Sequence, residues 1–147
     1  MKRSDRLQRV AEHFGEDRDL ASRKLVELRT AMDLADERLR GLRDYLDSYH
    51  TELEQIRQTG TTSAKLQNYT AFLAQLHEAL QQQERHADAA RRAFERQMDV
   101  WYQARSQVRA VEQAAQRNAA MEQKQLDSAE QRQLDDLALY RLAGGKA

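Results

Sequence analysis

The sequence predicts an all-α protein in which two long helices form an antiparallel coiled-coil hairpin with an overhanging C-terminal part of the second helix. The 147-residue chain has 33% charged residues and no proline, a composition typical of coiled coils and long helices. Apolar residues recur in alternating strides of four and three on both sides of one break, and such a sustained heptad pattern indicates a coiled coil. The break is short, so we expect a single domain whose two helices are antiparallel neighbours.

The first helix is expected over residues 4–57, because its heptad seam runs without interruption from Leu7 to Ile56. The seam consists of Leu7, Ala11, Phe14, Arg18, Ala21, Leu25, Leu28, Met32, Ala35, Leu39, Leu42, Leu46, Tyr49, Leu53 and Ile56. Arg18 is its one charged member. Gly41 lies within the same stretch and permits close packing there, at a cost of about 1 kcal/mol relative to alanine.

The break is the sequence TGTTS, residues 59–63, and we expect a turn over residues 58–63. Gly60 suits the C-terminal cap of a helix. The hydroxyl groups that follow it suit the N-terminal cap of the next helix.

The second helix is expected over residues 64–140, with a flexible end over residues 141–147. Its seam consists of Leu66, Tyr69, Leu73, Leu76, Leu80, Gln83, Ala87, Ala90, Phe94, Gln97, Trp101, Ala104, Val108, Val111 and Ala115. At 1.5 Å per residue the first helix is about 80 Å long and the second about 115 Å. Residues from about 118 onward are therefore expected to be unpaired, frayed or reserved for another protein. Leu126, Leu134, Leu137 and Tyr140 form either a partner-binding stripe or the apolar content of a marginal helix.

Composition argues against several functional classes. Lysine and arginine balance aspartate and glutamate at 24 each, so no net field favours nucleic acid. Cysteine is absent, and no apolar run approaches the roughly 20 residues that span a bilayer. Catalytic and phosphate-binding motifs are also missing. We expect a soluble cytoplasmic protein that is not an enzyme and takes no cofactor and no small-molecule substrate.

The four histidines do not follow a metal-binding pattern along the chain. They are His13, His50, His77 and His86. None has a second histidine three or four residues further on, and Gln81 stands where a zinc-protease helix would have one. We therefore expect no metal site.

Aromatic residues near the turn suggest a partner surface. Tyr49 lies on the first seam and Tyr45 one position off it, while Phe72 lies one position off the second seam. Folding the chain at residues 60–61 places Tyr49 near Phe72 and Tyr45 near Leu76. The resulting apolar patch consists of Leu42, Tyr45, Tyr49, Phe72, Leu76 and Ala79, and is called the aromatic patch below. An apolar patch across two helices favours partner binding; alternatively, Tyr45 and Phe72 widen the seam.

These residues resemble a known family. The spacing A-x3-L-x2-L-x2-Y-x3-Y is formed by Ala35, Leu39, Leu42, Tyr45 and Tyr49, and NYTAFLAQLHEAL follows the turn at residues 68–80. Together they resemble the FliJ family of flagellar type III export components, and the resemblance covers most of the chain. Arg38 and Gln83 stand where it leads us to expect glutamine and histidine.

The resemblance implies a stalk-like export factor that is cytoplasmic and peripherally associated with the inner membrane. The end that carries both termini would enter the hexameric ring of the flagellar export ATPase, with Leu7, Phe14, Leu126 and Leu134 as candidate contacts. The aromatic patch would bind the cytoplasmic domain of the membrane export gate. Family members also escort the chaperones of export substrates.

Two other interpretations remain open. The chain could be a structural or scaffold coiled coil, for example a homodimer in which the overhanging segments pair. It could also be the equivalent stalk of a virulence type III secretion system. The partner-binding interpretation predicts a monomer when the protein is free.

Overall fold

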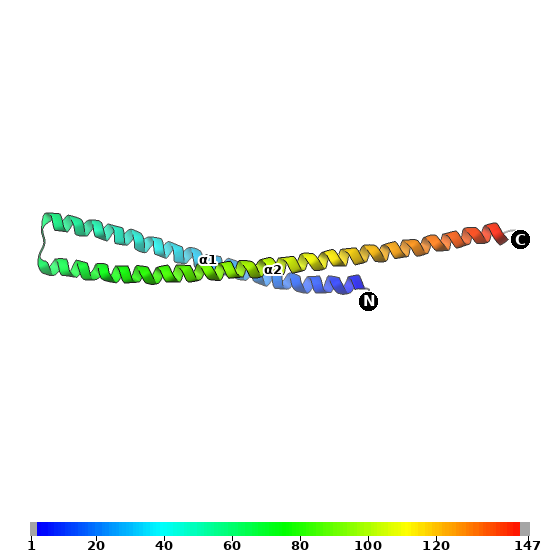
Figure 1. The fold of residues 1–147 in the computed structure, drawn as a ribbon, viewed down its shortest axis with the longest axis horizontal. Helices are drawn as coiled ribbons and strands as arrows, with labels where there is room; N and C mark the ends of the chain where they lie inside the picture. The colour runs from blue at the N-terminus through cyan, green and yellow to red at the C-terminus, as the bar shows by residue number, and fades with distance from the viewer. Residues whose placement is uncertain (1–2, 145–147) are drawn as a thin grey trace. The chain divides into compact units, whose positions relative to one another are not determined.

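The computed structural model describes residues 3–144 and consists of two helices joined by residues 60–62 (Figure 1). Helix α1 spans Arg3–Thr59 and helix α2 spans Ser63–Gly144. No strand occurs among these residues, and the predicted all-α antiparallel hairpin is confirmed. Both helices extend slightly beyond the predicted ends, most clearly at Gly144, because Leu142 and Ala143 are good helix formers. Of the expected flexible end over residues 141–147, residues 141–144 belong to α2, and residues 145–147 lie outside the described residues.

The chain divides into two compact units. The hairpin unit is Leu20–Trp101 and contains the turn. The terminal unit comprises Met1–Asp19 and Tyr102–Ala147, of which residues 3–19 and 102–144 are described.

The turn has the capping chemistry that the sequence predicts. Gly60 has a positive φ of 92°, and its N–H donates to the carbonyl of Ile56 at 3.0 Å. A left-handed residue just past a helix is a common helix end, and glycine adopts it without a Cβ clash. On the other side, the Lys65 N–H donates to the Thr62 hydroxyl at 3.3 Å, which makes Thr62 the N-cap of α2.

The core of the hairpin unit follows the two predicted seams. Leu46, Leu53 and Leu73 form one buried cluster near the turn, and Ala35, Leu39 and Ala87 form a second one. All the predicted seam residues are buried or half-buried. Gly41, in contrast, is exposed, and nothing lies within 4 Å of where its Cβ would be. The close packing allowed for at this glycine is therefore absent.

Two glutamines on the second seam bond to the backbone of α1. The Gln83 side-chain amide donates to the Ala35 carbonyl at 3.1 Å, and the Gln97 amide donates to the Ala21 carbonyl at 3.1 Å. The small alanine side chains leave room for each amide to reach the backbone. Since polar seam residues specify the register of a coiled coil, these bonds fix how α1 and α2 are aligned.

The terminal unit has a thinner core than the hairpin unit. Its buried residues are Ala11, Ala104, Val108 and Ala115. Arg18, the charged seam residue, is half-buried, and its guanidinium contacts the Asp19 carboxylate at 3.4 Å, so its stem covers apolar surface while the charge stays in water.

Within the same unit, the last part of α2 has no buried residue. Every side chain from residue 123 to residue 144 is exposed, although the segment is helical throughout. Side-chain bonds from Gln123 to Asp127 at 3.0 Å and from Gln131 to Asp135 at 3.1 Å support it. The sequence allowed this segment to be unpaired, frayed or reserved for another protein, and the structure shows a continuous helix instead of a frayed segment. We call residues 119–144 the C-terminal segment.

We predict that Gln97→Leu raises the free energy of unfolding by about 1 kcal/mol. Burying a leucine contributes about 2 kcal/mol, while losing the amide bond to Ala21 costs about 1 kcal/mol, because that carbonyl keeps its helical bond. Urea unfolding followed by circular dichroism measures the change. Gln81→Leu, at an exposed position, is the matched control and should change stability by less than about 0.5 kcal/mol. A destabilised Gln97→Leu variant would contradict this interpretation.

Candidate functional site

Four aromatic rings from the two helices form one continuous cluster close to the turn. Tyr49 is its centre: its ring centroid lies 4.8 Å from Phe72, 5.3 Å from Tyr69 and 6.3 Å from Tyr45. Tyr45 also meets Phe72 edge-on, at 6.3 Å and 79°. Tilted and edge-on pairs at such distances are favourable beyond the area that they bury. The aromatic cluster therefore holds its own rings in place.

The cluster brings together some predicted neighbours and adds one. The predicted proximity of Tyr49 and Phe72 is confirmed. Tyr45, which the sequence placed opposite Leu76, has its ring against Phe72. The heptad pattern places Tyr69 on the seam but does not indicate its contact with Tyr49. The NYxxF spacing could have indicated it, since Tyr69 and Phe72 are three residues apart on one helix face.

Exposure differs among the members of the aromatic patch. Tyr45 is 52% exposed, whereas Leu42, Tyr49, Phe72, Leu76 and Ala79 are half-buried. Tyr49, Phe72 and Leu76 therefore contribute to holding the helices together. Tyr45 lies against Tyr49 and Phe72 and leaves about half of its area exposed to solvent.

The phenol of Tyr49 has an altered acidity. Burial raises the pKa of Tyr49, and the charges that would form on Tyr69 and Tyr45, together with that of Glu52, add to the rise. Each of these effects disfavours a phenolate at this position. Tyr49 is consequently held in its neutral form as a packing residue.

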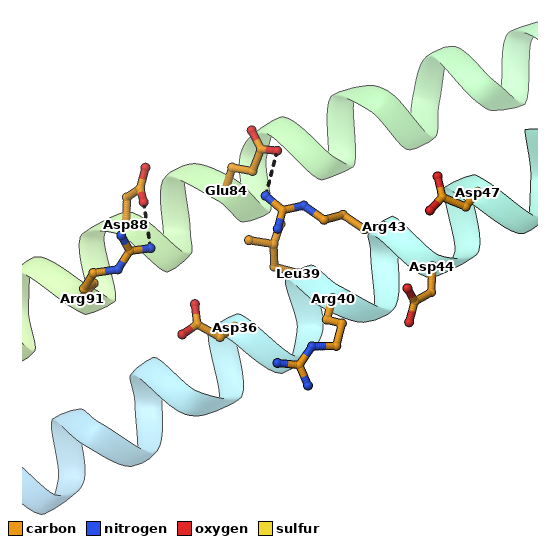
Figure 2. Close-up of a pocket in the computed structure, with 9 residues that line it drawn as sticks. All are labelled: Asp36, Leu39, Arg40, Arg43, Asp44, Asp47, Glu84, Asp88 and Arg91. Atoms are coloured by element: carbon orange, nitrogen blue, oxygen red, sulfur yellow. Dashed lines mark hydrogen bonds and ion pairs between the residues drawn. The ribbon is translucent and has the colours of Figure 1, made fainter.

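The other flank of the same seam is charged. Helical residues advance by about 100°, so Tyr45 and Tyr49 lie on one side of the buried Leu46, and Arg43 and His50 lie on the other. Figure 2 shows Arg43 reaching from α1 to Glu84 of α2, at 3.5 Å. This flank forms a groove lined by Asp36, Leu39, Arg40, Arg43, Asp44, Asp47, Glu84, Asp88 and Arg91.

One pair of histidines that the sequence pattern does not predict also lies on the charged flank. The His50 and His77 rings, one from each helix, have centroids 5.7 Å apart. Spacing along a single helix does not reveal this pair, because the two residues meet only when the chain folds back. Among residues 3–144, no three side chains of the metal-binding types gather at one place.

The residues proposed for the ATPase ring all belong to the terminal unit. Leu7 and Phe14 are half-buried, so they contribute to the packing of that unit. Leu126 and Leu134 are 52% and 60% exposed and are available for contact. Of the two positions that depart from the family pattern, Arg38 is exposed, and Gln83 is used inside the hairpin through its bond to Ala35.

Comparison with known families decides what kind of protein has this fold. The family model described as Flagellar FliJ protein matches residues 2–146. The chain belongs to the FliJ family. It is therefore a component of the flagellar type III export apparatus, and the family is a non-catalytic one. Neither the curated proteins nor the solved structures contain a match to the chain. Within residues 3–144 neither helix has a segment apolar enough to cross a bilayer.

We predict that the hairpin loses stability in alkaline solution through Tyr49. Because its folded-state pKa is raised, the unfolded phenol ionises first as pH rises past the usual value of about 10. Stability is thus complete below that pH and is lost as pH rises through the folded pKa. Tyr49→Phe should lose less stability than the wild type between pH 9 and about 11, measured by urea unfolding and referenced to pH 7. An equal loss in both proteins would contradict the assignment to Tyr49.

Proposed function

We propose that this FliJ-family protein is a stalk-like coupling component of the export apparatus. The terminal unit binds the hexameric ring of the flagellar export ATPase. The aromatic patch of the hairpin unit binds the cytoplasmic domain of the membrane export gate. The protein works at the cytoplasmic side of the inner membrane and escorts the chaperones of export substrates.

The observation that carries the gate contact is the exposed ring of Tyr45 on top of a packed aromatic cluster. Tyrosine is enriched among residues that dominate binding energies, especially at the centre of an interface. Contacts with Tyr49 and Phe72 hold the ring in position. A positioned side chain loses little conformational freedom when a partner binds.

The alternative, in which Tyr45 only widens the seam, is weaker. A side chain that widens a seam buries most of its area against the opposite helix. Tyr45 instead leaves 52% of its area exposed. Leu46, its neighbour, already fills the seam at this level and is buried.

The ATPase contact is supported by exposed leucines on the C-terminal segment. Leu126, Leu134 and Leu137 are more than half exposed, and helical geometry places them within an arc of about 80°. An exposed apolar stripe on a helix is a usual docking element for another protein. The residues that precede it, at the level of Ala115, are already packed within the terminal unit.

We predict that Tyr45→Ala combined with Phe72→Ala weakens binding to the cytoplasmic domain of the cognate export gate at least tenfold. Truncating interface aromatic residues typically costs more than about 1.4 kcal/mol, which corresponds to a factor of ten. Isothermal titration calorimetry measures the binding. Tyr102→Ala is the matched control, because Tyr102 is 49% exposed in the other unit, and it should bind like the wild type.

The same variants separate a docking role from a packing role. Since Tyr45 is exposed and Phe72 is half-buried, the double variant should remain helical and lose only modest thermal stability. Gate binding unchanged in a folded double variant would exclude the patch as the docking surface. A loss of helicity in the double variant that also occurs in Phe72→Ala alone would show that Phe72 is a packing residue. The binding role would then be tested with Tyr45→Ala alone.

We predict that Leu126→Asp combined with Leu134→Asp reduces stimulation of ATP hydrolysis by the cognate export ATPase, because charges on the stripe would have to be desolvated on binding. Turnover and ring formation are followed while the protein is titrated. Val26→Asp with Leu34→Asp, exposed positions in the hairpin unit, is the control and should stimulate normally. If wild-type protein at saturation changes neither turnover nor ring formation, the stalk function is wrong. Dimers in sedimentation would then favour a scaffold coiled coil.

A further inference from the structure

The charged flank of the hairpin follows a seven-residue repeat of facing side chains. Arg43 of α1 faces Glu84 of α2 as an ion pair at 3.5 Å. Seven residues closer to the turn on each helix, His50 faces His77. Flanking positions of a coiled coil usually pair opposite charges. Here two imidazoles, which are not oppositely charged, stand in the place of an ion pair.

Two facing imidazoles have the geometry of a shared metal ion. Zinc–nitrogen bonds are about 2.0–2.1 Å long, and tetrahedral or octahedral coordination places two ligands at about 90–110° to each other. Two imidazoles on one ion then have ring centroids about 5 Å apart. The rings of His50 and His77 are 5.7 Å apart and tilted by 59°. Both side chains are exposed, so small rotations of the rings could close the remaining distance.

We propose that His50 and His77 form a two-imidazole binding site for a divalent transition-metal ion of the zinc, nickel or copper class. Neutral imidazole suits these metals, whereas magnesium and calcium prefer oxygen ligands. The histidines supply two ligands, and water completes the coordination. Such a site is open, so the ion exchanges with solvent and can accept a further ligand.

A metal ion bound by His50 and His77 cross-links α1 and α2 near the turn. His50 and His77 are 27 positions apart in the chain and approach each other only in the folded hairpin, so the ion binds the folded state in preference to the unfolded one. Preferential binding to the folded state stabilises it in proportion to the logarithm of the metal concentration.

The proposed site is independent of the aromatic patch. Around Leu46, His50 lies about 40° to one side, whereas Tyr49 and Tyr45 lie about 60° and 100° to the other. Around Leu73 of α2, His77 and Phe72 are separated in the same way. The metal site therefore leaves the proposed gate contact free, and neither proposal depends on the other.

The test is a titration of the full chain, without an affinity tag of histidines, with Zn²⁺ and separately with Ni²⁺ in a non-chelating buffer. Calorimetry should give one ion per chain, and the thermal midpoint should rise with metal concentration and return to its starting value when EDTA is added. His50→Gln and His77→Gln should each abolish the rise. Without metal, both variants should melt like the wild type.

His13→Gln and His86→Gln are the matched controls, since both residues are exposed and neither meets another histidine ring among the described residues. Both should keep the full metal-dependent rise. A rise that survives in His50→Gln, or is lost equally in His86→Gln, would overturn the site. Metal-dependent dimers in sedimentation would show that the ion cross-links two chains, which would overturn a site within one chain. Tyr45→Ala with Phe72→Ala should retain the metal response, so failure of the gate proposal is distinguishable from failure of this one.

Discussion

The alignment of α1 against α2 is the constraint on which the rest of the hairpin unit depends. Heptad packing alone tolerates a shift of seven residues, because the seam would again meet apolar side chains. Two features oppose such a shift: the three-residue connection capped by Gly60 and Thr62, and the bonds from Gln83 and Gln97 to carbonyls of α1. In the resulting alignment Tyr49 meets Phe72 on one flank and His50 meets His77 on the other.

Features that depend on local chemistry could be predicted from the sequence. The seams and the turn follow from heptad spacing and from the capping preferences of glycine and threonine, and each agrees with the structure. The proximity of Tyr49 and Phe72 needed only the position of the turn. The carbonyl partners of Gln83 and Gln97 could not be predicted, because they depend on the space left by Ala35 and Ala21. The histidine pair could not be predicted for a related reason: His50 and His77 lie on different helices, so no metal-binding spacing along one helix indicates their contact.

Membership of the FliJ family gives a context to features that the fold alone leaves unexplained. A two-helix hairpin needs neither an exposed tyrosine beside a packed aromatic cluster nor exposed leucines on a C-terminal segment that has no buried residue. Neither feature stabilises the free protein, because apolar groups that stay exposed gain nothing from folding. In the coupling role that we propose, each can become the buried centre of an interface. The two surfaces belong to different units, as is suitable for two different partners.

The most direct test of the alignment is a nuclear Overhauser experiment on the free protein with assigned aromatic side chains. The account predicts cross-peaks between the Tyr49 and Phe72 rings, between the Tyr49 and Tyr69 rings, and between the His50 and His77 rings. These three contacts all require the same alignment. Cross-peaks from the Tyr49 ring to Ala79 or Lys65, each seven residues from Phe72, with none to Phe72, would show that the helices are shifted by one heptad and would contradict both flanks together.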